Sequence, residues 1–273
     1  MHIPLLLLSF LTPTLTTASL SASPSPSPLP YRTIANITLP ATPLIFAAES
    51  YVLHHAPSFY NHSMRTWLYG ALHLRHNPAL ASLVDPEVLA LALILHDIAS
   101  PHNLSHPLVT PHNRFEVDSA NAAASFIRSH PDGKDWPDWR VQRVWDGIAL
   151  HAEPKLALHK EADVFAIFWG NELDFSWGRE GGEKKGITEE EYRAVERAFP
   201  RGEGGSSGMG LLGFVAWYCR YKPESTYVCS DSETDTWMQA YGEMLVPGYS
   251  AVGHRLLDGA LAAAGVNVSA VGV

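Results

Sequence analysis

The sequence has few cysteines and no excess of positive charge. Only two of its 273 residues are cysteine, Cys219 and Cys229, which excludes a framework of several disulfides. The 19 lysines and arginines are outnumbered by 28 aspartates and glutamates, for a formal net charge of -9. A surface of that sign repels phosphate backbones and anionic lipid headgroups. We therefore expect neither nucleic acid nor a membrane surface as a partner.

Long apolar runs are also scarce. The run from Ile3 to Leu11 is shorter than the ~20 residues needed to span a bilayer. Small polar residues follow it at Thr16 and Thr17, which is the order of a secretory signal peptide, although only His2 stands where a basic segment is usual. We expect residues 1–18 to be a signal peptide and the mature protein to be secreted, with an N-terminal anchor as the less favoured alternative.

Secretion changes the interpretation of the two cysteines and of the asparagines. An oxidising compartment permits a disulfide between Cys219 and Cys229, and two buried free thiols are the alternative. Sequons for N-glycosylation stand at Asn36, Asn61, Asn103 and Asn267. These sites predict a glycoprotein, with Asn61 expected to be too buried to be modified.

Patterns typical of strands are rare in the rest of the chain. Residues 19–45 begin with alternating Ser and Pro and are interpreted as an extended linker and N-terminal extension. From Phe46 onward few alternating Val, Ile or Thr runs occur, and no internal repeat is found. We predict one all-α domain over residues 46–265, since 46% apolar residues suffice for a single core.

Local signals place several helices. Asp85 followed by Pro86 is an N-cap with proline at the first helical position, and it opens the apolar stretch Val88 to Leu95, which predicts a central helix. Thr188 and Glu191 form a capping box for a helix that reaches Phe199. Further helices are expected at Glu116–Arg128, Val141–His151 and Ala162–Phe175, the last with a strand as an alternative for part of it. The Gly- and Ser-rich tract from Arg201 to Gly210 predicts a loop.

Three of the fourteen histidines stand apart from the others: His62, His96 and His151. His96 and Asp97 close the fully apolar helix, where a polar pair must be ligated or hydrogen-bonded to be tolerated. Imidazole and carboxylate together suit zinc, iron or manganese, and His62 from the preceding helix is a third donor. A lone histidine is more often a satisfied core or surface residue, which is the default for the other eleven.

An acid from a later helix would complete the ligand set. Asp174 follows the apolar run Val164 to Leu173, where an unpaired carboxylate is costly. Asp163 stands at the start of that run and is expected to be exposed. Asp174 is therefore the predicted fourth ligand.

Four motifs in order resemble a known family. They are Tyr60-Asn61-His62-Ser63-Met64-Arg65, Leu95-His96-Asp97-Ile98, Arg114-Phe115-Glu116 and Ile148-Ala149-Leu150-His151. Together with a later aspartate, this series resembles the HD-domain superfamily. Within that superfamily it resembles the cyanamide hydratase-like branch, as a secreted fungal-type member. The resemblance covers roughly Glu49 to Arg201 and includes Phe199-Pro200-Arg201.

The resemblance implies an HD-type helical bundle around a metal centre and a set of roles. The implied ligands are His62, His96, Asp97 and Asp174, holding one divalent ion, zinc before iron or manganese. Glu116 and His151 are implied as catalytic residues beside Asp97, although Glu116 fits a first-turn carboxylate of its helix about equally well. Asn61 and Arg65, which flank the first ligand, are the expected substrate-binding residues.

The implied activity is hydration of a small nitrile such as cyanamide to urea through metal-bound water. A metal-dependent phosphohydrolase of a nucleotide or phosphate ester is the alternative, ranked lower because only Arg65 and Arg114 lie near the motifs and phosphate sites recruit more cations. A two-iron oxygen-activating site and a non-catalytic secreted protein on the HD scaffold are further alternatives. In each enzymatic case the partner is a small molecule.

Overall fold

The computed structural model describes residues 29–101, 103–177, 184–201, 208–226 and 242–249. The predicted signal peptide, most of the Ser/Pro-rich linker, Cys229 and Asn267 lie outside the described residues. The predictions of secretion and of a Cys219–Cys229 bridge therefore stay predictions.

Helices make up most of the described chain, as the all-α prediction required. The elements in chain order are β1 (Tyr31–Ile34), β2 (Ile37–Pro40), α1 (Pro43–His55), a short 3-10 helix (Pro57–Phe59), α2 (Tyr60–Arg75), α3 (Pro78–Ala81), α4 (Pro86–Leu95), α5 (Phe115–Ser129), α6 (Asp138–Ala149), α7 (Pro154–Ala157), α8 (Ala162–Ser176), α9 (Glu189–Ala198), α10 (Gly208–Tyr221) and a second 3-10 helix (Pro223–Thr226).

The sequence predicted that the folded part starts near Phe46, but regular structure already begins at Tyr31. Strands β1 and β2 form an antiparallel hairpin that pairs Tyr31 with Pro40, and α1 follows from Pro43. Ile37 and Leu39 alternate into the core and are almost completely buried. Each strand has only four residues, too short for its alternation to stand out from the linker in the sequence.

Two predicted helix starts are present as expected. The Asp85 side chain accepts hydrogen bonds from the N–H groups of Glu87 and Val88 at the start of α4. At α9, Thr188 and Glu191 form the reciprocal capping box. Residues 162–176 form a helix, α8, and not a strand. Each of these starts depends on side chains within a few residues, which is why the sequence alone predicts them.

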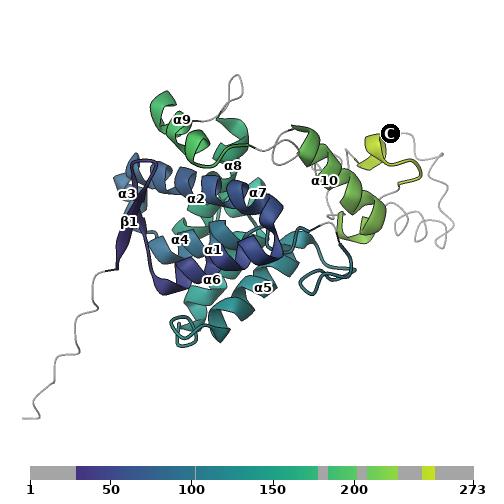
Figure 1. Ribbon diagram of the computed structural model, residues 1–273, viewed down its shortest axis with the longest axis horizontal. Coiled ribbons are helices and arrows are strands. Elements are labelled where there is room, and N and C mark those ends of the chain that lie inside the picture. The colour runs from purple at the N-terminus through teal and green to yellow at the C-terminus, as the bar shows by residue number, and fades with distance from the viewer. Residues whose placement is uncertain (1–28, 102, 178–183, 202–207, 227–241, 250–273) are drawn as a thin grey trace, which may run out of the picture.

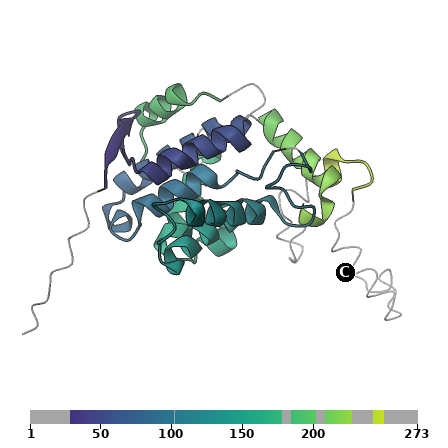
Figure 2. The same cartoon turned by 60° about the horizontal axis from the view of Figure 1, so that its bottom comes forward.

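Helix α4 lies at the centre of the bundle, against α1, α2, α5, α6 and α8 (Figures 1 and 2). Its residues from Val88 to Leu95 are 0–2% exposed, which accounts for an apolar sequence on every side of the helix. Helix α2 packs most extensively on α8. A side chain at Gly170 would clash with Leu93 and approach the main-chain oxygen of Thr66. This close approach, one turn before Asp174 on α8, brings Asp174 to the start of α2.

Helix α10 lies at one end of the bundle, beyond the long loop between α4 and α5 (Figure 1). Its first residues, Gly208 to Gly210, belong to the helix and correct our expectation of a loop up to Gly210. The Tyr218 hydroxyl donates to the main-chain oxygen of Ala99 at 3.2 Å. The Lys222 ammonium, fully buried just after α10, pairs with the Asp118 carboxylate of α5 at 3.2 Å. A buried ion pair thus ties the end of α10 to α5.

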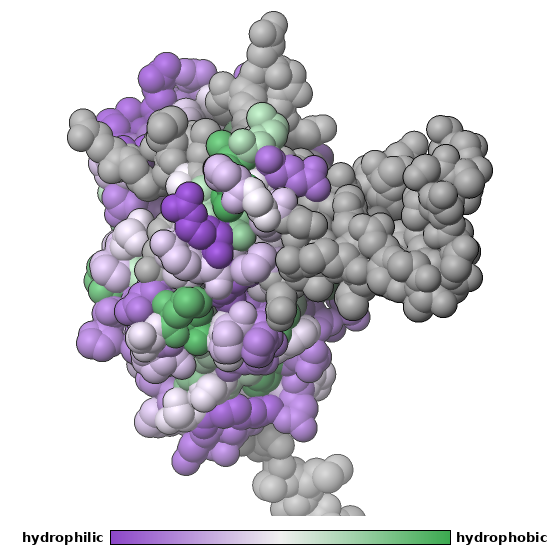
Figure 3. Space-filling view, turned by 90° about the vertical axis from the view of Figure 1, so that its right-hand side faces the viewer, coloured by the Kyte–Doolittle hydropathy of each residue, from purple (hydrophilic) through white to green (hydrophobic). Residues whose placement is uncertain are grey.

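The described residues include no helix suited to crossing a membrane, and their apolar surface is divided into small patches. None of their helices has both the length and the hydropathy to cross a bilayer. On the face in Figure 3, hydrophobic residues appear as separate small patches among hydrophilic ones. Scattered exposed apolar side chains of this kind are usual for protein surfaces and carry no functional conclusion.

A buried histidine on α2 makes folding dependent on pH. His73 is 4% exposed, and neither of its ring nitrogens has a hydrogen-bond partner among the described residues. Burial, with the nearby Lys185 and His76 charges, lowers the pKa of His73 to about 4. An unfolded histidine takes up a proton below a pKa of about 6.5. The folded state therefore loses stability relative to the unfolded state as the pH falls from 6.5 towards 4.

We expect His73→Phe to remove this contribution. Between pH 7.5 and pH 5 the wild type should lose about 2 kcal/mol more unfolding free energy than the variant. Urea unfolding of both proteins at the two pH values, with chelator present to exclude metal effects, measures the difference. Equal pH dependence in the two proteins would show that His73 titrates normally in the fold.

Candidate metal centre

The predicted donors His62, His96 and Asp97 come together in the buried interior. His62 is the third residue of α2, and His96 caps the C-terminal end of α4 with Asp97 next to it. The three residues are 6%, 0% and 7% exposed. One donor atom from each lies within 4.8 Å of the others. The central helix thus carries two donors to a point that the start of α2 also reaches.

The tautomers of the imidazoles follow from their acceptors. The Nδ1 atom of His96 lies 2.8 Å from the main-chain oxygen of Leu93, and the Nδ1 atom of His62 lies 2.7 Å from Asp174 Oδ2. Neither acceptor carries a proton when Asp174 is ionised, so in the neutral form of each ring Nδ1–H donates and Nε2 keeps its lone pair. Burial lowers the pKa of His96 to about 3, against the opposing charge of Asp97, so this ring is neutral at neutral pH.

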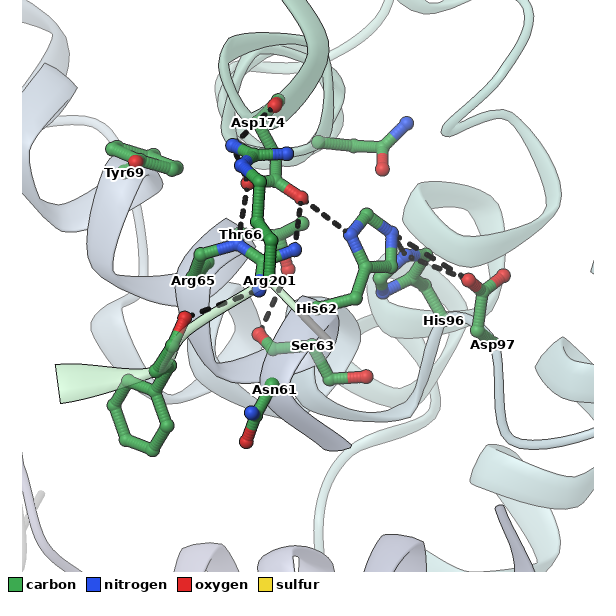
Figure 4. A network of polar contacts seen from close by, with 12 residues as sticks. Asn61, His62, Ser63, Arg65, Thr66, Tyr69, His96, Asp97, Asp174 and Arg201 are labelled. Carbon is green, nitrogen blue, oxygen red and sulfur yellow. Dashed lines mark hydrogen bonds and ion pairs between the residues drawn. The ribbon is translucent and has the colours of Figure 1, made fainter. Parts of the chain in front are cut away.

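Two Nε2 lone pairs consequently face each other. The Nε2 atoms of His62 and His96 are 3.1 Å apart. The Asp97 Oδ2 atom lies 3.5 Å from the first and 3.4 Å from the second (Figure 4). Without a cation between them, such lone pairs repel each other at this distance. Burial alone raises the pKa of Asp97, but the neighbouring histidines outweigh burial and lower it.

These distances fit a tetrahedral ion. Zinc bonds of about 2.0–2.2 Å to nitrogen and oxygen place neighbouring ligand atoms roughly 3.3–3.6 Å apart, close to the three separations observed. Two imidazole nitrogens and one carboxylate oxygen are also a usual zinc donor set. His62, His96 and Asp97 would therefore hold the ion if it binds here. The residues present therefore fit the predicted metal.

Asp174 lies beside this cluster, on the far side of the His62 ring. Its Oδ2 atom accepts from His62 Nδ1, while His62 Nε2 faces His96 and Asp97 (Figure 4). Burial alone raises the pKa of Asp174, but hydrogen bonds from His62 and Arg65 outweigh burial and hold it well below its usual range. The geometry is that of a carboxylate that orients a histidine ligand. The structure thus gives Asp174 a contact with the predicted ligand His62 but does not include it among the three clustered donors.

Arg65 and Asn61 point their donors towards the same side as Asp174. Arg65 Nε and Nη2 donate to the two Asp174 oxygens at 2.7 and 2.9 Å, and Nη1 donates to the main-chain oxygen of Phe199 at 3.2 Å. Asn61 Nδ2 donates to the main-chain oxygen of Pro200 at 2.9 Å. These contacts tie α2 to α8 and to the end of α9. A substrate-binding role for either residue stays a prediction.

His151 lies next to the cluster. Its ring is 4.7 Å from that of His96, and its Nε2 atom is 4.0 Å from Asp97 Oδ1. Its Nδ1–H donates to the main-chain oxygen of Ile148 at 2.7 Å, so Nε2 is the unprotonated nitrogen of the neutral ring. His151 thus offers a proton acceptor within one water molecule of Asp97.

Glu116 has a different environment. It is 1% exposed, and its carboxylate is paired with Arg114, which also contacts Glu153 at 2.7 Å. Burial opposes the charge of Arg114, but the two glutamates outweigh burial and raise the pKa of the Arg114 side chain. A catalytic role for Glu116 stays a prediction, because the contact that holds its carboxylate is with Arg114.

Asp163 is buried and not exposed, which corrects our expectation. It is 1% exposed, accepts from the Asp85 N–H at 2.7 Å and pairs with Arg143 at 2.7 Å. The reason is tertiary, because α8 packs against both α4 and α6. Burial therefore does not separate Asp174 from Asp163, and the difference lies in their partners.

Three further residues border the centre without having been predicted to. The Ser100 hydroxyl lies 3.4 Å from Asp97 Oδ1, Tyr218 contacts Ala99, and Arg201 contacts Asp174. Burial and the charges of Asp97, Glu116 and Asp118 raise the pKa of Tyr218. Ser100 was within reach of prediction from its position next to the His-Asp pair. Arg201 was noted only as part of Phe199-Pro200-Arg201, and Tyr218 has no local signal.

Comparison with known proteins agrees with this geometry. Residues 59–190 match the family described as HD domain. The matched segment runs from just before α2 to the first turn of α9 and includes His62, His96, Asp97, His151 and Asp174. This likeness supports the HD-domain superfamily, whose members are commonly metal-dependent hydrolases. No curated protein matches the chain.

Proposed function

We propose that the protein is a metal-dependent enzyme that adds water to a small uncharged nitrile such as cyanamide, giving urea. The observation that carries the proposal is the convergence of His62 Nε2, His96 Nε2 and Asp97 Oδ2 within 3.1–3.5 Å. A divalent ion held by these residues, zinc by its donor set, would supply an acidified water and Lewis-acid polarisation of the substrate.

In this proposal, side chains of the protein transfer the protons of the reaction. Hydration of a nitrile forms a C–O bond and replaces the carbon–nitrogen triple bond. One water proton goes to the nitrile nitrogen to give an isourea, and the remaining hydroxyl proton then moves to the same nitrogen to give urea. His151 Nε2 accepts a proton and returns it, because Nδ1–H stays fixed on the Ile148 main-chain oxygen. Asp97 Oδ1, 4.0 Å from His151 Nε2, stabilises the imidazolium formed in between. Asp174 keeps the His62 ring in its ligand orientation.

Charge pairing favours an uncharged substrate over a phosphate ester. Arg65 and Arg201 pair with Asp174, and Arg114 pairs with Glu116 and Glu153. A phosphate would have to compete with these carboxylates for each guanidinium. The donors are also nearly covered, since His96 is 0% exposed and His151 is 4% exposed. A small neutral molecule meets both conditions better than a nucleotide does.

Urea formation from cyanamide tests the proposal. The zinc-loaded protein is expected to form urea, and His151→Gln should lower kcat by about 10²–10⁴-fold while metal content stays unchanged. His159→Gln, at an exposed position, is the matched control and should keep wild-type activity. The absence of urea from metal-loaded wild type would exclude the hydratase activity, and metal-dependent phosphate release from a phosphoester panel would support the hydrolase alternative instead.

A further inference from the structure

Arg201 lies beyond the segment that matches the HD domain family, yet it contacts the centre of the network behind His62. Its Nη2 atom donates to Asp174 Oδ1 at 2.7 Å and to the Asp174 main-chain oxygen at 2.8 Å. Its Nε and Nη2 atoms also donate to the two Glu196 carboxylate oxygens, at 3.0 and 2.9 Å. One guanidinium therefore fixes both the side chain and the backbone of Asp174.

Four hydrogen bonds restrict the orientation of the Asp174 carboxylate. Oδ1 accepts from Arg65 Nε and Arg201 Nη2, and Oδ2 accepts from Arg65 Nη2 and His62 Nδ1. The two arginines approach from α2 and from the end of α9, while Asp174 stands on α8. The contact to His62 is the only one of the four that faces the clustered donors. Rotation of the carboxylate would break three contacts to arginine together with the one to His62.

The end of α9 is itself anchored on α2. Glu196 accepts from the Tyr69 hydroxyl at 2.8 Å and from Arg201. The main-chain oxygens of Phe199 and Pro200 accept from Arg65 and Asn61, the residues that flank His62 in the first turns of α2. Glu196 to Arg201 thus form a clip, which we call the α9 clip, that joins the first ligand's helix to Asp174.

We infer that Arg201 is a positioning residue for the metal centre. Through Asp174 it holds the His62 ring in the orientation that presents Nε2 to the ion, so the α9 clip sets how tightly the metal is bound. This inference rests on the proposed metal centre and not on the identity of the substrate. Loss of an outer partner of a metal-bound histidine typically lowers metal affinity by about 10–100-fold.

Zinc affinity of the full-length protein tests the inference directly. Competition with a chromophoric chelator should show Zn²⁺ binding about 10–100-fold weaker in Arg201→Gln than in the wild type. The absorption bands of the Co²⁺-loaded variant should also shift, because Asp174 keeps only its contacts to Arg65 and holds the His62 ring less firmly. Arg193→Gln is the matched control: it removes an arginine from α9 that pairs with Glu189 at the surface, with 65% of its side chain exposed. Its affinity should equal that of the wild type.

A conservative variant separates geometry from charge. Arg201→Lys keeps the positive charge, but a single ammonium does not present a planar fork to Asp174 and Glu196 together. Its Zn²⁺ affinity is expected to lie between those of the wild type and Arg201→Gln. Thermal unfolding of the metal-free proteins supplies the measurement that a purely structural role would move.

Three results would overturn the inference. The first is wild-type affinity in Arg201→Gln. The second is equal weakening in Arg201→Gln and Arg193→Gln. The third is a loss of affinity that follows the loss of metal-free stability across the four proteins, which would reduce Arg201 to a folding role. If the wild type itself bound no Zn²⁺, the proposed metal centre would fail instead.

Discussion

Replacing His96 and Asp97 together by alanine is expected to reduce bound metal from about one ion per chain to almost none. Two of the three clustered donors are lost, and the remaining His62 Nε2 cannot hold a divalent ion alone. The loss of affinity should exceed the about 10–100-fold expected for a change in an outer residue such as Arg201. Elemental analysis of the purified proteins after dialysis measures it, and urea formation should disappear with the metal.

Two controls keep this result interpretable. His159→Ala removes an exposed histidine and should leave the metal content unchanged. Asp97→Asn keeps the shape of the side chain but removes the charge, so it should also lower metal content without leaving a cavity. Unaltered metal in the His96→Ala, Asp97→Ala variant would locate the ion elsewhere and remove the basis of the proposed function. Circular dichroism confirms that each variant is folded before the comparison.

Asp118→Ala is expected to destabilise the fold by about 3–5 kcal/mol, because it leaves a buried charge without its partner. The side chains of Asp118 and Lys222 are 1% and 0% exposed. Asp118 also accepts from the Thr110 N–H and hydroxyl and from Asn113, so its loss releases the loop before α5 as well. Burial lowers the pKa of Lys222 against the opposing effect of Asp118. Urea unfolding of the metal-free protein at pH 7.5 measures the effect.

The matched comparison is an ion pair at the surface. Asp146 pairs with Lys160 at 2.9 Å with both side chains partly exposed, so Asp146→Ala should cost less than about 1 kcal/mol. The double variant Asp118→Leu, Lys222→Met should recover much of the stability, since an apolar pair avoids the desolvation of two charges. Equal losses for Asp118→Ala and Asp146→Ala would mean that the Asp118–Lys222 pair behaves as a solvated one.

Loss of this pair also has a functional consequence. Lys222 follows α10, whose Tyr218 contacts Ala99, two residues after Asp97. Phe115 packs between Phe214 of α10 and His151, with ring-centroid distances of 5.1 Å to Phe214 and 5.7 Å to His151. Releasing α10 would therefore expose the side of the centre where His151 lies. The stability of a pair remote in sequence and the shielding of the metal centre are linked through one helix.

Sequence prediction succeeded where the determining contacts are local. The N-cap of α4 and the capping box of α9 depend on side chains two or three residues away, and both form as expected. It was wrong where packing between distant segments decides. Asp163 was expected to be exposed, but the contacts of α8 with α4 and α6 bury it. The hairpin before α1 was missed because strands of four residues give too short an alternation.

The sequence by itself determined the candidate donors His96 and Asp97, because a polar pair that ends a fully apolar helix requires ligands or hydrogen bonds wherever that helix lies. It also offered His62, near the start of the preceding helix, as a third donor. Only the tertiary structure decided which partners the other buried polar residues contact. Asp174 and His62 are 112 residues apart in the chain, and no local pattern states which of its neighbours a buried carboxylate will contact. The close approach of α2 and α8 at Gly170 brings Asp174 into contact with Nδ1 of His62. Arg65 and Arg201 both form ion pairs with the same carboxylate. Which side of a histidine a carboxylate contacts is decided by helix packing, because the two residues come from helices that are far apart in the sequence.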